Sequence, residues 1–253
     1  MKALILAAGY ATRLYPLTKE YPKPLLEIGR RPIISYIVDK LKKIDSIDEI
    51  LVVTNSKFIN KFKLWRKGVI LDKKITLIDD LTHNNADRLG AIGDISFVLK
   101  KKKINDDLLV IGGDNLFSGN LKNFILFAKK NKPDVSIGLF RLNSRKDAMR
   151  YGVAKINSNK RIIDFKEKPL NPQSNFVAMC LYYIPQIRLG LIKDYISISN
   201  NKVDATGKYI GWLKERQDIF GFVFKGSWFD IGDHKYLNAA KENFRKNKER
   251  EIR

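Results

Sequence analysis

Cysteine, histidine and long apolar runs are all scarce in this chain of 253 residues. The single cysteine, Cys180, excludes a disulfide framework and a thiolate metal cluster. Two histidines, His83 and His234, are too few for a histidine-rich metal site. No apolar run reaches the roughly 20 residues that span a bilayer, and the apolar start over residues 3–8 is too short for a signal peptide. We therefore expect a cytoplasmic protein without membrane insertion.

Acidic residues are scarce relative to basic ones, with 27 Asp and Glu against 48 Lys and Arg and a formal net charge of +21. Such a charge fits a nucleic acid, an anionic membrane surface or a phosphorylated substrate as partner. The lysines are scattered, and aromatic residues do not alternate with them as a base-stacking surface requires. We interpret the charge as a feature of composition and expect no nucleic-acid partner.

Short apolar segments alternate with amphipathic ones over the first 140 residues. Residues 3–6 and 49–53 have the pattern of buried strands, and residues 33–41 between them that of a helix. Such alternation predicts a parallel sheet with right-handed crossovers. After residue 140 two short strand patterns flank a polar turn, which predicts a β-hairpin.

We expect one α/β domain over residues 1–253, with a Rossmann-like, mixed but mainly parallel sheet flanked by helices. Residues 1–140 are expected to form the half with the alternating pattern, and residues 141–240 the half with a small inserted β-rich lobe. Residues 241–253 are expected to form a basic helix at the C-terminal end.

A loop of small residues follows the first predicted strand, and residues 6–14 read LAAGYATRL. Backbone N–H groups in such a loop can approach a phosphate closely. Arg13 adds a forked positive charge and Lys23 a point charge at the same place. Open α/β sheets bind ligands at the carboxyl ends of their strands, where this loop lies.

Two aspartates follow other predicted strands, Asp114 in GGDN and Asp230 in WFDIG. Each alone is better explained as a turn former beside glycine. Together with the phosphate loop they predict a Mg²⁺ site, because Mg²⁺ takes one or two carboxylates plus substrate phosphate oxygens. When an acceptor phosphate attacks the α-phosphate of an NTP, the nucleophile is already an anion and no general base is needed. Arg13, Lys23, Asp114 and Asp230 are therefore the candidate catalytic residues.

Six segments together resemble, in order, the sugar-1-phosphate nucleotidyltransferases such as the glucose-1-phosphate thymidylyltransferases. They are Leu6–Leu14, Pro22–Leu25, Gly113–Asn115, Tyr151–Val153, Glu167–Pro169 and Trp228–Gly232. The resemblance implies a GT-A-like fold, Mg²⁺ as cofactor, and an NTP and a sugar 1-phosphate as substrates, with dTTP or UTP favoured. The products that it implies are an NDP-sugar and pyrophosphate. Residues 1–140 are then expected to be mainly the nucleotide-binding half, and residues 141–240 the acceptor-binding half with the second metal ligand. Relatives are often dimers or tetramers, so a homo-oligomer is expected from the resemblance.

The resemblance also assigns roles to single residues. It implies nucleotide contacts at Leu6, Ala7, Ala8, Gly9, Thr12, Arg13, Asn85 and Gly90. It implies phosphate contacts at Arg13 and Lys23, and metal contacts at Asp114 and Asp230. Acceptor contacts are implied at Gly152, Glu167 and Lys168, with Glu167 on sugar hydroxyls and Lys168 on the sugar phosphate. Asn85 is equally well explained as an ordinary loop residue.

Four residues depart from the family pattern. Ala11 replaces a loop glycine, which is tolerated if its φ is negative. Met179 and Cys180 stand where small residues and a glycine are usual, and Gly211 where an acidic residue is frequent. We interpret Cys180 as a small buried apolar residue. No hexapeptide repeat follows in the printed sequence, so no acetyltransferase activity is expected.

Two alternatives stay open. A cytidylyltransferase for phosphocholine or a related alcohol phosphate shares the loop, the lysine and the aspartates, and Tyr182, Tyr183 and Trp228 could supply an aromatic cage. A regulatory protein that binds nucleotide without turnover is the second. It is disfavoured because Lys23 and both aspartates are retained.

Overall fold

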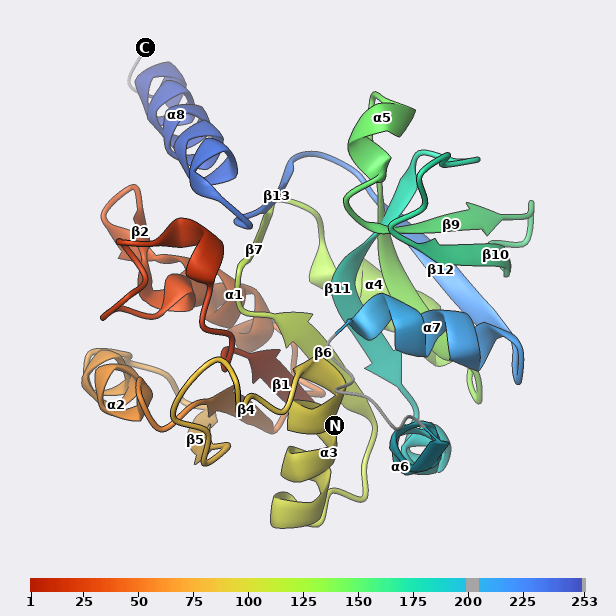
Figure 1. Cartoon of the computed structure of the whole chain (residues 1–253), viewed down its shortest axis with the longest axis horizontal. Helices are drawn as coiled ribbons and strands as arrows, with labels where there is room; N and C mark the ends of the chain where they lie inside the picture. Colours follow the sequence, from red (N-terminus) through yellow and green to blue (C-terminus); the bar gives the residue numbers. More distant parts are fainter. Residues whose placement is uncertain (199–204, 252–253) are drawn as a thin grey trace.

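The computed structural model of the chain describes residues 1–198 and 205–251 (Figure 1). The last two residues of the predicted basic segment lie outside the described residues. The helices are α1 (Ile33–Lys42), α2 (Ile59–Lys67), α3 (Ala91–Lys102), α4 (Leu121–Lys130), α5 (Arg145–Ala148), α6 (Gly190–Ile198), α7 (Thr206–Lys214) and α8 (His234–Glu251). The strands are β1 (Lys2–Leu6), β2 (Glu27–Ile28), β3 (Arg31–Pro32), β4 (Glu49–Thr54), β5 (Lys74–Asp79), β6 (Leu108–Gly112), β7 (Asn115–Phe117), β8 (Val135–Arg141), β9 (Gly152–Ile156), β10 (Ile162–Glu167), β11 (Phe176–Ile184), β12 (Ile219–Phe224) and β13 (Trp228–Asp230).

Nine of these strands form one sheet, in the order β10-β9-β11-β6-β1-β4-β5, with β8 paired to β11 and β12. Strands β6, β1, β4 and β5 are parallel, as the alternating pattern predicts. Strand β11 runs antiparallel to β6, β8 and β9, and the predicted hairpin is β9–β10. The expected mixed, mainly parallel sheet flanked by helices is confirmed.

Helices cover both faces of this sheet because its central strands are apolar on both sides. One buried cluster joins the sheet to α1, α2 and α4 through residues such as Ile37, Phe62 and Phe124. The other joins it to α3, α6 and α7 through residues such as Ile95 and Leu213. In Figure 1, α3 and α7 lie in front of the sheet, and α1 and α4 behind it. Each large apolar side chain buried in this way contributes about 1.5–3 kcal/mol to stability.

Helix α8 packs beside this three-layer body rather than on the sheet. Its Leu237 and Ala240 join a separate buried cluster with Ile28, Ile33 and Leu116. Figure 1 shows the helix projecting at the edge of the molecule. Among the described residues, none of the helices combines the length and the apolar composition that crossing a bilayer demands.

A short ribbon of two strands, β7 and β13, was not predicted and organises the site. It lies off the main sheet and pairs Asp230 with Asn115 in antiparallel register. Each of its strands has three residues, too few for a recognisable alternation of apolar and polar side chains. Through this pairing two segments more than a hundred residues apart in sequence meet beyond the end of β6.

Candidate active site

The predicted phosphate loop is held rigidly where β1 ends. The carbonyl of Leu6 accepts a hydrogen bond from Gly113 N at 2.8 Å, and that of Ala8 accepts one from Asn55 Nδ2 at 2.8 Å. A Cβ added to Gly113 would lie 2.7 Å from the Leu6 oxygen, so glycine is required for the two chain segments to approach. The loop is therefore fixed before any ligand arrives, which lowers the entropic cost of binding.

Ala11 contradicts the condition under which its methyl group was expected to be tolerated. Its φ is 49° and its ψ 43°, in the left-handed region, instead of negative. This conformation costs a residue with a side chain about 1–2 kcal/mol relative to the right-handed one. The Ala11 carbonyl accepts hydrogen bonds from Leu14 N at 2.9 Å and Thr18 Oγ1 at 2.8 Å, and these bonds hold the turn. The loop keeps its glycine-like shape without the glycine.

Lys23, Asp114 and Asp230 meet at the carboxyl end of the sheet. Lys23 begins a short 3₁₀ turn after Pro22, and its ammonium group donates to the Asp114 carboxylate. Asp114 lies directly before β7, and Asp230 ends β13, so the ribbon brings Asp230 close enough for the charge of Asp114 to act on it, and both line one cavity. The Asp114 carbonyl also accepts a hydrogen bond from Ile231 N at 3.3 Å. The structure thus brings together three of the four candidate catalytic residues in one cluster.

The electrostatics of this cluster favour an added cation. Burial and the neighbouring charge of Asp114 raise the pKa of Asp230 to about 6, although Lys23, Arg13 and Arg150 act in the opposite direction. A carboxylate pair with a raised pKa is disfavoured in its doubly ionised form, and a divalent ion relieves that repulsion. Two carboxylates with room for phosphate oxygens match the ligands of Mg²⁺. The donor set therefore fits the metal that the sequence predicts.

A cavity of about 200 Å³ lies on one side of Asp114. Leu6, Ala8, Gly9 and Gly90 line it, as the resemblance implies. The other four residues expected there do not line it. Ala7 is buried in the core, Thr12 and Asn85 are exposed outside the cavity, and Arg13 lines a different space. We refer to this space as the nucleotide cavity.

Asn85 lies outside because of how its loop folds. The Asp87 carboxylate accepts hydrogen bonds from the backbone N–H groups of His83 and Asn84, both at 3.0 Å, and turns the loop back on itself. The wall expected to carry Asn85 carries Asp80, Arg88 and Asp94 instead. The sequence gives only a weak signal for the two aspartates: Asp80 follows a predicted strand, and Asp94 lies in the first turn of a predicted helix.

A second cavity, of about 180 Å³, lies on the other side of Asp114, and we call it the acceptor cavity. Gly152 and Glu167, at the start of β9 and the end of β10, line it as expected and face each other in register. Burial raises the pKa of Glu167, against the charges of Lys168 and Lys208. Tyr182 and Trp228 also line the cavity, whereas Tyr183 is fully buried with its hydroxyl bonded to Asp107. Tyr183 therefore cannot belong to an aromatic cage here.

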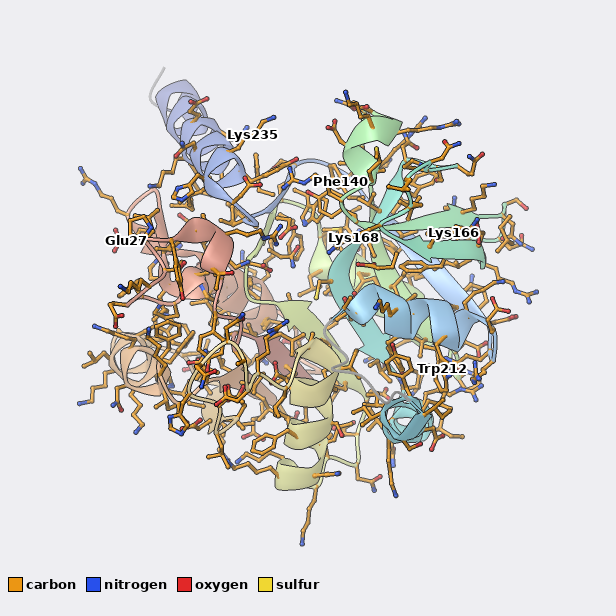
Figure 2. All side chains as sticks on the ribbon, in the orientation of Figure 1. Glu27, Phe140, Lys166, Lys168, Trp212 and Lys235 are labelled. Atoms are coloured by element: carbon orange, nitrogen blue, oxygen red, sulfur yellow. The ribbon has the colours of Figure 1, made fainter. Side chains whose placement is uncertain are left out.

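Positive charge gathers in a third space, of about 350 Å³, next to Asp230. Arg13, Arg150 and Lys168 line it together with Gly232. Lys168 is exposed, and in Figure 2 it lies toward the middle of the molecule, beside the upper end of β11, while Lys166 lies on the hairpin. Three cations in one space are suited to bind phosphate groups. Arg150 was not among the residues predicted from the sequence. Its position directly before the Tyr151-Gly152 motif was the feature that could have indicated it.

The wall between the nucleotide and acceptor cavities is an irregularity in β11. The strand register shifts between Ala178 and Tyr182, and Cys180 within the shift has a φ of 51°. Cys180 borders both cavities, and burial together with Asp114 and Asp230 raises the pKa of its thiol to about 12. The thiol is therefore protonated near neutral pH, which agrees with an unreactive residue. Met179 is buried beside it.

Gly211, the fourth departure, lies away from the acceptor cavity. A Cβ there would meet only Phe165 atoms at 3.9 Å. Gly207, one turn earlier in α7, lines the cavity instead, and a Cβ on it would lie 1.7 Å from Glu167 Oε2. Gly211 therefore does not line the acceptor cavity, whereas Gly207 and Gly152 do.

Comparisons with known proteins agree with this geometry. Residues 2–247 match the family model described as nucleotidyl transferase. The bifunctional protein GlmU of Methanococcus aeolicus is 30% identical over 254 residues, which cover 100% of this chain and 56% of the relative. A Sulfolobus acidocaldarius protein named as a mannose-1-phosphate guanyltransferase is 29% identical over 92% of this chain and 60% of its own length. The chain thus spans little more than half the length of these relatives.

A solved structure has the same fold over nearly the whole chain. It is a crystal structure from Bacillus anthracis, named as a glucose-1-phosphate thymidylyltransferase in complex with sucrose. The TM-score is 0.81 at 27% identity, and the match covers 97% of this chain and 95% of the other. The family model, the relatives and the shared fold lead to one conclusion: the chain belongs to the nucleotidyl transferase family, as the order of its six motifs indicates.

Proposed function

We propose that the protein transfers a nucleoside monophosphate from an NTP to a sugar 1-phosphate, with Mg²⁺ as cofactor, and releases pyrophosphate. The observation that carries this proposal is the meeting of Lys23, Asp114 and Asp230 between the nucleotide and acceptor cavities. Two similar proteins are named for a hexose 1-phosphate, mannose 1-phosphate in one and glucose 1-phosphate in the other. Their names differ in the nucleotide, so the comparisons leave that choice open.

In this reaction the protein has to orient the substrates and stabilise negative charge, and it does not have to transfer a proton. A phosphate oxygen of the acceptor attacks the α-phosphorus of the NTP, a new P–O bond forms, and the bond to the pyrophosphate oxygen breaks in line with it. No proton need move, because the attacking oxygen is already ionised near neutral pH. In the proposal Lys23 lies near the α-phosphate and offsets the negative charge that builds up on the pentavalent phosphorus. Asp114 and Asp230 would hold Mg²⁺, which would supply Lewis-acid stabilisation of the same charge.

The remaining residues would hold the two substrates for this attack. In the proposal the N–H groups around Gly9 and the charge of Arg13 bind the triphosphate. Glu167 accepts hydrogen bonds from sugar hydroxyls, and Lys168 pairs with the acceptor phosphate. Arg150 lines the same cationic space, fixed by an ion pair with Asp233 at 2.6 Å. Reacting atoms placed in this way gain much of their rate from orientation alone.

A cytidylyltransferase acting on phosphocholine remains the second candidate, because aromatic rings border the acceptor cavity. Tyr151 and Trp228 lie with ring centroids 5.3 Å apart, and both line it. Such rings attract a quaternary ammonium group. Glu167 in the same cavity suits either a hydroxyl donor or a cation, so the choice rests on measurement.

The test is pyrophosphate release measured for each of five NTPs against a series of hexose 1-phosphates and phosphocholine, with Mg²⁺ and with EDTA. The proposal expects metal-dependent release with an NTP and a hexose 1-phosphate. Release confined to CTP and phosphocholine would establish the second candidate instead. Nucleotide binding without release for any pair would make the protein a non-catalytic nucleotide binder.

A further inference from the structure

Two buried carboxyl groups form the wall of the nucleotide cavity opposite the glycine loop. Asp80 follows β5 directly and Asp94 lies in the first turn of α3, and their exposed fractions are 3% and 6%. Both line the cavity together with Gly9 and Gly90. Buried aspartates need a structural or a functional explanation, because charged side chains are rarely so completely covered.

Asp80 is held in a fixed orientation. Its Oδ1 accepts hydrogen bonds from Thr82 N and Thr82 Oγ1, both at 2.8 Å, and its N–H donates to Thr54 O at 2.9 Å. The Thr82 hydroxyl lies 3.0 Å from the Tyr10 hydroxyl, which fixes it in turn. These hydrogen bonds fix the orientation of the Asp80 carboxyl group before a ligand binds.

The two carboxyl groups are neighbours: burial raises the pKa of Asp80, and Thr82 and Asp94 act in the opposite direction. The N-terminus of α3 favours a negative charge on Asp94. The pair therefore presents carboxylate oxygens, which accept hydrogen bonds, to the cavity.

The bases differ in what their reading edges offer to such an acceptor. Uracil and thymine place one N–H between two carbonyl oxygens, and those oxygens repel a carboxylate. Guanine places N1–H and an amino group side by side, and two adjacent donors match one carboxylate. Cytosine and adenine offer an amino group next to a ring nitrogen that accepts. Arg88, on the same wall, donates through Nη1 to Asn85 O at 2.6 Å, and a guanidinium group has several donors that suit a base carbonyl.

We propose that Asp80 and Asp94 select an NTP whose base carries an amino group on its reading edge, with guanine preferred over cytosine and adenine. Guanine alone combines two adjacent donors for the carboxylate with a carbonyl for Arg88. The inference rests on the proposed function in taking this cavity as the nucleotide site. It replaces the preference for dTTP or UTP expected from the resemblance, in which an amide at Asn85 would read a pyrimidine. Asn85 lies outside the cavity, and the wall carries acceptors instead of an amide.

The experiment is calorimetric titration of the full chain with GTP, CTP, ATP, UTP and dTTP in the presence of Mg²⁺. We expect GTP to bind at least about tenfold more tightly than UTP or dTTP, because a site built for hydrogen-bond donors rejects a base that lacks them. The ratio of GTP affinity to UTP or dTTP affinity in the wild-type protein tests the proposal without any variant. Equal affinities, or a preference for UTP or dTTP, would overturn the proposal.

Three variants locate the effect. Asp94→Asn and Asp80→Asn keep the shape and an acceptor oxygen but remove the carboxylate, and each should reduce the ratio of GTP to UTP affinity by roughly tenfold. Asp79→Asn is the matched control, since Asp79 bonds Ser56 Oγ and Leu81 N and does not line the cavity. A ratio unchanged in both cavity variants would overturn the assignment to this pair.

Binding and turnover separate this inference from the proposed function. Tight GTP binding without pyrophosphate release for any acceptor would support base selection and contradict the transferase. Turnover with UTP or dTTP in preference to GTP would support the transferase and overturn base selection.

Discussion

The two ends of the central parallel strands treat buried charge in opposite ways. At the amino end of β6 the Asp107 carboxylate accepts hydrogen bonds from Lys132 Nζ at 2.8 Å, from Gln186 N at 2.9 Å and from the Tyr183 hydroxyl. At the carboxyl end of the same strand Asp114 and Asp230 crowd together, with Lys23 as the cation in direct contact. At the amino end the carboxylate is paired by several donors of the chain, whereas at the carboxyl end two carboxylates share one cation in direct contact.

The pKa values follow this division. Although burial acts against it, the partners around Asp107 lower the pKa of that carboxyl group. Burial and Asp114 raise the pKa of Asp230 to about 6. A lowered carboxyl pKa stabilises the fold near neutral pH, whereas a raised one destabilises the ionised form that a cation needs. Substitutions at the carboxyl end should therefore change activity, and substitutions at the amino end should change stability.

The largest expected effect comes from Asp114→Asn. The change keeps the shape of the side chain but removes one carboxylate from the cluster beside Lys23. We expect kcat for pyrophosphate release to fall on the order of 10³-fold, the loss typical when a group that stabilises transition-state charge is removed. The measurement is single-turnover kinetics at saturating substrates.

Its control is Asp147→Asn, on the exposed face of α5 and away from all three cavities. That variant should keep wild-type kcat. The unfolding transition of Asp114→Asn should stay cooperative, because no packing is lost. Turnover within threefold of wild type would refute the charge-stabilising role of Asp114.

A smaller effect is expected from Gly207→Ala at the acceptor cavity. The new Cβ would fall 1.7 Å from Glu167 Oε2, so the carboxylate must leave its present position. We expect KM for the acceptor to rise about tenfold, while KM for the NTP stays unchanged, since a polar contact to one substrate is lost. Steady-state kinetics with each substrate varied in turn measures both values.

Gly211→Ala is the matched control in the same helix. Its Cβ would make only ordinary contact with Phe165, and alanine in a helix interior should raise stability by about 0.5–1 kcal/mol. If both variants raised the acceptor KM equally, the position of Glu167 would not be the cause.

The same division explains how much the sequence alone predicts. Strands β1, β4 and β6 are continuous apolar runs, and the loops after such strands meet at one edge of a parallel sheet. The structure therefore brings Lys23, Asp114 and the glycine loop together as the order of motifs suggests. Asp230 arrives there only through the β7–β13 ribbon, whose three-residue strands carry no periodic signal.

What the sequence could not predict depends on how loops fold in three dimensions. Asn85 was chosen by spacing from Gly90, but the hydrogen bonds to Asp87 turn that loop away from the cavity. Asp80 and Asp94 are separated in sequence by the whole loop, and their contact follows from the packing of α3 on the sheet. A negative φ is the condition under which alanine is expected to be tolerated at Ala11, and the turn closed by the bonds from Leu14 and Thr18 has a positive one.

The smallest expected effect is on stability alone, from Asp107→Asn. The carboxylate is only 13% exposed and bonds to Lys132, Gln186 and Tyr183, so its loss should lower the free energy of unfolding at pH 7 by about 1–3 kcal/mol. Because the folded-state pKa is lowered, this stabilisation is present above the ordinary aspartate pKa and is lost as the pH falls through the folded-state value. Urea unfolding should thus show a difference in stability between wild type and variant at pH 7 that shrinks in acid.

The control is the neighbouring Asp106→Asn. It removes an ion pair to the N-terminal ammonium from a side chain that is 40% exposed, and the free energy of unfolding should fall by less than about 1 kcal/mol. Neither variant should change kcat, because both substituted residues lie at the end of β6 remote from Asp114. A loss of turnover with wild-type stability would contradict the assignment of stability to the amino end and of activity to the carboxyl end.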